Sequence, residues 1–107
     1  MAAYLVDVDS SDTHMVTEPT CKVGSDGSSD IVVTAPSVLP SHVNLESRDD
    51  GYWAALAPGA TNTSKFLLFF DVPTASLNGV KLHGKAVQIS NGDRLKVGSR
   101  LFEFRIA

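Results

Sequence analysis

The sequence predicts an all-β fold, and three observations support that prediction. Apolar and polar side chains alternate along most segments, as they do in half-buried strands, and no window repeats apolar residues with the 3.6-residue period of a helix. Nearly every segment ends in Gly, Pro, Asn or Asp, which favour turns. About eight to eleven short strands in a chain of 107 residues indicate a β-sandwich or a barrel.

The expected strands are short and are separated by turns or polar loops. In chain order they cover residues 4–8, 15–16, 20–23, 30–33, 42–46, 52–56, 65–70, 95–97 and 101–106. Asp49-Asp50-Gly51 is typical of a hairpin turn, and Asn78-Gly79 and Asn91-Gly92 are typical of tight turns. Lys65–Phe70 is the most apolar segment and is expected to form a buried strand. Trp53 is expected in the core, and His14 and His83 are expected in turns.

Composition and charge exclude several classes of protein. The single cysteine, Cys21, cannot form an internal disulfide, so we expect it to be a buried apolar residue in a reducing compartment. No apolar run approaches the roughly 20 residues of a membrane span, and the first residues lack the basic start of a signal peptide. We therefore expect a cytoplasmic or nuclear location without direct membrane insertion.

The charge is divided unevenly along the chain. Residues 1–50 hold nine acidic side chains against Lys22 and Arg48, a balance of −7, whereas residues 51–107 carry +4. The net charge of −3 argues against a nucleic-acid partner, because such domains usually have an excess of basic residues.

No pattern in the sequence predicts catalysis or a cofactor. The three histidines have no acidic residue or cysteine at ligand spacing, so we expect no metal site. No nucleophile-elbow motif brings serine, histidine and aspartate together. The sequence therefore predicts that the protein is not an enzyme.

Three segments, in order, carry a family resemblance. They are residues 23–33, residues 38–45, and residues 77–79 together with 89–98 and 101–104. Together they resemble the forkhead-associated (FHA) domain family over about residues 4–106. The resemblance implies one domain over residues 1–107, an FHA-like β-sandwich of about eleven mostly antiparallel strands. The loops at one end of such a sandwich bind a phosphothreonine peptide.

The resemblance also implies which residues have structural roles. It assigns these roles to Gly24, His42, Asn78, Gly79, Gly92 and Asp93. We expect His42 to hydrogen-bond between loops rather than to act in catalysis.

The positions of the phosphate ligands depart from the family pattern. The family's phosphate-binding arginine falls on Ser25, its serine falls on Leu39, and the next position, often basic, is Pro40. Leu39 has no hydroxyl and Pro40 has no backbone N–H. Because a phosphate of charge near −2 needs paired donors, and Asp26 repels it, ordinary phosphothreonine recognition is not expected.

The third peptide-contacting element has two possible alignments. Gly59–Thr63 resembles the family's Gly-Ser-Thr-Asn-Gly and keeps Thr61 and Asn62 as the contacting pair. The rival alignment places Ser76–Gly79 in that role and leaves a long connection after Trp53, so we prefer the first. An inserted segment then covers about residues 64–75, and Lys65, Phe66 and Phe69 form either core or a protein interface.

The prediction is a non-catalytic protein–protein interaction or scaffolding module with a degenerate phosphothreonine site. Its predicted peptide-binding residues are Ser25, Ser41, Thr61 and Asn62, and its partner is a protein. One alternative is a phosphoprotein partner bound by unusual ligands, with Lys22 contributing. Another is the cytoplasmic FHA-like domain of type III secretion inner-ring proteins, which residues 24–26 and 29–32 and Pro40-x-His42 resemble.

Overall fold

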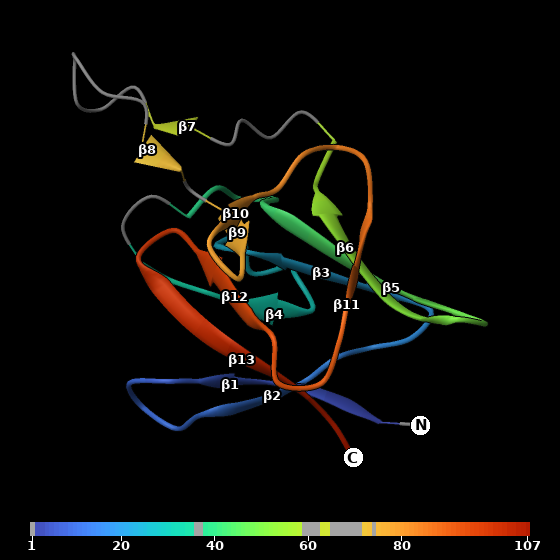
Figure 1. Cartoon of the computed structure of the whole chain (residues 1–107). Coiled ribbons are helices and arrows are strands. Elements are labelled where there is room, and N and C mark those ends of the chain that lie inside the picture. The colour runs from blue at the N-terminus through green and yellow to red at the C-terminus, as the bar shows by residue number, and fades with distance from the viewer. Residues whose placement is uncertain (1, 36–37, 59–62, 65–71, 74) are drawn as a thin grey trace.

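The computed structural model describes residues 2–35, 38–58, 63–64, 72–73 and 75–107 (Figure 1). Within these ranges the secondary structure consists of strands, with no helix. The strands are β1 Ala3–Asp7, β2 Thr13–Met15, β3 Thr20–Gly24, β4 Ile31–Val32, β5 Val43–Arg48, β6 Gly51–Leu56, β7 Thr63–Ser64, β8 Val72–Pro73, β9 Ala75–Leu77, β10 Val80–Lys81, β11 Val87–Ile89, β12 Arg94–Val97 and β13 Arg100–Ile106. The predicted all-β class is confirmed.

The strands form two sheets that pack face to face. The six-stranded sheet has the order β10-β9-β12-β13-β1-β2, and the five-stranded sheet has the order β11-β6-β5-β3-β4. Among the described residues, β3 and β4 are the parallel pair and the other neighbours run antiparallel. These eleven strands confirm the predicted sandwich, and β7 with β8 adds a separate two-stranded sheet.

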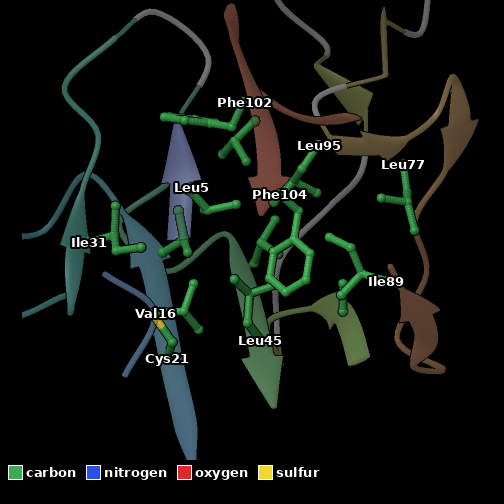
Figure 2. Packing of buried hydrophobic residues seen from close by; sticks show 14 of the residues in the cluster. Leu5, Val16, Cys21, Ile31, Leu45, Leu77, Ile89, Leu95, Phe102 and Phe104 are labelled. Carbon is green, nitrogen blue, oxygen red and sulfur yellow. The ribbon is translucent and has the colours of Figure 1, made fainter. Parts of the chain in front are cut away.

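The core lies between the sheets and is built by the alternation that the sequence shows. In β1 the side chain of Leu5 points inward, and in β13 those of Phe102 and Phe104 do the same. Figure 2 shows Phe104 between Leu45 and Ile89, which belong to the opposite sheet. Each buried aromatic ring removes about 150–250 Å² from water, so few such residues suffice for a sandwich of this size.

Three expectations about single residues have clear outcomes. Cys21 is buried, as expected. Trp53 is not in the core: β6 directs Tyr52 inward and Trp53 to the outer face of its sheet, so that prediction was wrong. His14 lies in β2 and pairs with Leu5 of β1, so the prediction that it lies in a turn was wrong as well. The strand expected at residues 65–70 falls outside the described residues. Among the residues that the structure describes, no helix is long and apolar enough to cross a membrane.

Candidate functional site

The candidate site is the end of the sandwich where the β3–β4 and β4–β5 connections meet. The chain termini leave at the other end of the molecule (Figure 1). The N–H of Ser25 donates to the carbonyl oxygen of Leu39 at 2.9 Å, and the N–H of Asp26 donates to that of Pro40 at 3.3 Å. The hydroxyl of Ser29 also donates to the carbonyl oxygen of Pro40, at 3.3 Å. The two connections are therefore joined to each other before any partner binds.

Gly24 makes this close approach possible. It is the last residue of β3, and a Cβ atom built on it would lie 2.0 Å from the carbonyl oxygen of Pro40 and 2.7 Å from its carbonyl carbon. Real Cβ atoms do not approach other atoms so closely, so any larger residue would separate the two connections. Glycine is required here by space rather than by an unusual backbone angle.

His42 holds the β4–β5 connection in place from the buried side. Its ring is fully buried, and Nδ1 accepts a hydrogen bond from the N–H of Leu39 at 3.2 Å. Its own N–H donates to the carbonyl oxygen of Val23, and its carbonyl oxygen accepts from the N–H of Ala57, both at 3.0 Å. Burial lowers the pKa of His42, which favours the neutral ring, and because Nδ1 accepts a hydrogen bond the proton of the neutral ring lies on Nε2. These contacts tie β3, the β4–β5 connection and the end of β6 together, which is a positioning role.

The backbone donors of the two connections are largely used within the loop end. Besides the N–H groups of Ser25, Asp26 and Leu39, the N–H of Ser28 donates to the carboxylate of Asp26 at 2.9 Å. The N–H of Ser29 donates to the carbonyl oxygen of Asp26 at 3.0 Å. Five N–H groups are therefore unavailable to a ligand, in contrast to loops that hold anions with free backbone donors.

The charge of the two connections is negative. Their charged side chains, among the described residues, are Asp26 and Asp30. The N–H of Ser28 lowers the pKa of Asp26, which favours its carboxylate form, and the side chain of Asp30 accepts the N–H of Lys22 at 2.8 Å. Ser25 is half-buried and Ser41 is exposed, so the polar groups offered to a partner are hydroxyls beside carboxylates.

Four other predicted residues stabilise turns at the opposite end. Asn78 and Gly79 have positive φ angles of 52° and 81°, and the Asn78 side chain accepts the N–H of Arg94 at 2.8 Å. Gly92 has a φ of 91°, and the carboxylate of Asp93 accepts the N–H of Ser90 at 2.8 Å. The structure does not bring these residues to the loop end.

The remaining predicted residues cannot be placed. Thr61, Asn62, Lys65, Phe66 and Phe69 lie outside the described residues. The insertion predicted at about 64–75 includes part of the β7–β8 sheet, in which Thr63 pairs with Pro73. Within the described residues, no group of three His, Cys, Asp or Glu side chains could hold a metal ion.

Sequence reasoning missed that the loop end satisfies its own donors. One local signal was present: an aspartate followed two residues later by a serine, as in Asp26 and Ser28, is typical of a turn in which the carboxylate accepts the second N–H. The bonds from Ser25 to Leu39 and from Asp26 to Pro40 join residues 14 positions apart, and no local pattern indicates them.

The chain is similar in sequence and in structure to known FHA domains. A family model described as FHA domain matches residues 21–98. Mycobacterium tuberculosis EmbR, solved in complex with a low affinity phosphopeptide, has a TM-score of 0.80 and 19% identity over 99% of this chain. This chain covers only 24% of the EmbR chain. No curated protein matches the sequence.

Two isolated FHA domains match over nearly their whole length. The FHA domain of the CT664 protein from Chlamydia trachomatis has a TM-score of 0.75 and 16% identity, covering 100% of this chain and 99% of that one. The MEK1 FHA domain, solved with the HOP1 pThr318 peptide, has a TM-score of 0.70 and 19% identity, covering 97% and 95%. At these identities the likeness shows the fold.

Proposed function

The chain belongs to the forkhead-associated (FHA) domain family, and we propose that it is a non-catalytic protein-interaction module that binds its partner without the family's usual phosphothreonine ligands. FHA domains are interaction modules that bind phosphopeptides. The finer proposal concerns what remains at the loop end of this chain when the family's arginine and serine positions are occupied by Ser25 and Leu39.

The observation that supports the proposal is the shortage of donors at the loop end. The N–H of Ser25 and the N–H of Leu39 both bond within the protein, and neither side chain can supply a cation. Pro40 has no N–H, and its carbonyl oxygen already accepts from Asp26 and Ser29. The position where a phosphate would bind therefore offers the hydroxyls of Ser25 and Ser41 but no cation, and the N–H groups of Ser25, Asp26 and Leu39 are already used.

Electrostatics acts in the same direction. A phosphothreonine carries a charge of about −1.5 to −2 at neutral pH, and removing it from water requires charge-assisted hydrogen bonds. Asp26 and Asp30 are instead like charges on the same connection. Without a paired arginine the phosphate loses hydration and meets repulsion, so a phosphate should add no affinity.

The solved relatives indicate the class of ligand. EmbR and the MEK1 FHA domain were each solved with a phosphopeptide. A segment of a partner protein at the loop end is therefore the ligand class that we propose for this chain. Ser25 and Ser41, with Thr61 and Asn62, are the proposed contacts.

The test uses pairs of peptides that differ only in phosphate. A degenerate peptide pool with a central threonine, and the same pool with phosphothreonine, should be titrated against the domain by isothermal titration calorimetry. We expect no binding that depends on the phosphate. Saturable, phosphate-dependent binding with a micromolar Kd would reject the proposal. If such binding were lost in the variants Lys22→Ala and Ser41→Ala, recognition by unusual ligands would be the correct explanation.

A further inference from the structure

The outer face of the five-stranded sheet contains a groove that is separate from the loop end. Its volume is about 320 Å³, which lies within the usual range of about 300–1,000 Å³ for ligand sites. We call it the outer-face groove and define it by Lys22, Asn44, Arg48, Trp53, Ala55 and Ala86. Lys22 pairs with Asn44, and Asn44 pairs with Ala55, so these three residues form a row across β3, β5 and β6.

The shape of the groove follows from side-chain size. Ala55 and Ala86 extend little beyond the backbone, whereas Trp53, two residues before Ala55 on the same face of β6, extends far beyond it. The floor of the groove at Ala55 and Ala86 is therefore low, and one of its borders is an indole ring. A partner's apolar side chain placed over Ala55 would pack against that ring.

Trp53 is held in place before any partner arrives. Its indole Nε1–H donates to the carboxylate of Asp50 at 3.0 Å, and the guanidinium carbon of Arg48 lies 4.8 Å from the ring centroid. Arg48 is held in turn by Glu46, with Nε and Oε1 3.0 Å apart. A half-exposed tryptophan with a fixed ring loses little entropy on binding, and Trp and Arg are enriched among the residues that dominate binding energy.

The charge at the groove favours an acidic group on the partner. Lys22 is exposed and takes part in none of the three ion pairs found among the described residues. Arg48 and Glu46 offset each other, so Lys22 is the remaining cation among the residues that line the groove. Two carboxylates lie beside the groove: Asp50 accepts the indole N–H of Trp53, and Asp30 accepts the backbone N–H of Lys22 rather than bonding to its ammonium group.

The spacing of the row selects the partner's conformation. Lys22 and Ala55 are two strand separations apart, or about 9.6 Å. A polyproline II segment has three residues per turn and rises about 3.1 Å per residue, so its residues i and i+3 lie on one side about 9.3 Å apart. An extended peptide of this type matches the row with one side chain at each end.

We propose that the outer-face groove is a second binding site, which takes an extended polyproline-II-type segment of a partner protein. An acidic residue of the segment faces Lys22, and a large apolar residue three positions along packs on Trp53 above Ala55 and Ala86. The site does not depend on the loop end and requires no phosphate.

Trp53 is the only tryptophan in the chain, so its fluorescence reports on the groove. The probe is a pool of tryptophan- and tyrosine-free peptides with the pattern Asp-Pro-Pro-Phe or Asp-Pro-Pro-Leu flanked by glycines. We expect a saturable change in emission. Replacing the aspartate of the pool by lysine should weaken binding about two- to fivefold, the effect of losing one exposed charge pair.

Two variants and a matched control locate the binding. Lys22→Glu should weaken binding about two- to fivefold, and Ala86→Arg, which fills the groove, should weaken it about tenfold. Lys96→Glu makes the same charge change on β12 of the other sheet and should have no effect. Far-UV circular dichroism checks that each variant is folded. An unchanged emission up to millimolar peptide, or equal binding to Ala86→Arg and to the unmodified protein, would overturn the proposal.

Discussion

Replacing Gly24 by alanine tests whether the two connections are locked together by close backbone contact. The new Cβ would lie 2.0 Å from the carbonyl oxygen of Pro40, and ordinary contacts begin at 3.4 Å, so the two backbones must separate by about 1.4 Å. This oxygen also accepts hydrogen bonds from Asp26 and Ser29 at 3.3 Å, which a movement of that size would break.

The expected cost follows from these contacts. Overpacking costs about 1–3 kcal/mol, and each lost hydrogen bond costs about 0.5–1.5 kcal/mol. Because the unfolded chain has less conformational entropy with alanine than with glycine, the substitution also stabilises the folded state by about 0.4–1 kcal/mol. We therefore expect Gly24→Ala to lower the free energy of unfolding by about 1–5 kcal/mol, measured by urea denaturation with circular dichroism. The melting temperature should fall by at least about 4 °C.

Gly27→Ala is the matched control. Gly27 lies in the same connection, has no atom within 4 Å of a built Cβ, and is not among the glycines with positive φ. Its stability should stay within about 0.5 kcal/mol of the unmodified protein. If Gly24→Ala behaved like Gly27→Ala, the connections would not be locked through this contact and the account of the loop end would be wrong.

Three further predictions concern titration and ligand choice. Burial lowers the pKa of His42 below its ordinary 6.5, so on acidification the unfolded chain takes up this proton first and stability is lost as the pH falls below about 6.5. Urea midpoints between pH 8 and pH 5.5 should fall more steeply than in His42→Gln, and parallel profiles would contradict this. For Asp7, burial raises the pKa, but the N–H groups of Ser10 and Asp9 and the charge of Arg100 outweigh it, and the pKa is lowered. Asp7→Asn should therefore cost about 1–2 kcal/mol at pH 7, with the difference shrinking in thermal melts as the pH falls below the ordinary value of 3.8. The double variant Ser25→Arg with Leu39→Ser should gain phosphate-dependent binding of phosphothreonine peptides by calorimetry, and a variant that still ignored phosphate would show that these are not the missing ligand positions.

Much of the fold could be predicted because the chain alternates so regularly. Alternation predicts that one of two adjacent aromatic residues in β6 faces inward, but it does not say which one. The phase depends on which face of β6 meets the other sheet, and there Tyr52 rather than Trp53 packs on Phe104 with the ring centroids 5.4 Å apart. The strand at His14 was missed for a related reason: β2 has three residues and exists through its pairing with β1.

The candidate site could be predicted only in part. The family resemblance indicated which residues matter, including Gly24 and His42, but not how their contacts are arranged. Whether the N–H of Ser25 is free depends on a residue 14 positions away, and this is decided by tertiary structure. The peptide-contacting pair Thr61 and Asn62, the insertion, the intracellular location and the secretion-ring setting stay predictions.

The pairing of the first and last strands determines how the protein responds to mechanical force. Ala3 faces Ile106 in the antiparallel β1–β13 pair, and the N–H of Ala107 donates to the carbonyl oxygen of Ala2 at 2.9 Å, so both chain ends leave side by side. Tension applied through the ends loads these hydrogen bonds one pair at a time, from the edge inward, instead of shearing them together. The sandwich should therefore peel open at low force. A partner held at the loop end, on the far side of the molecule, would lie outside the path of that force until β1 is stripped away (Figure 1).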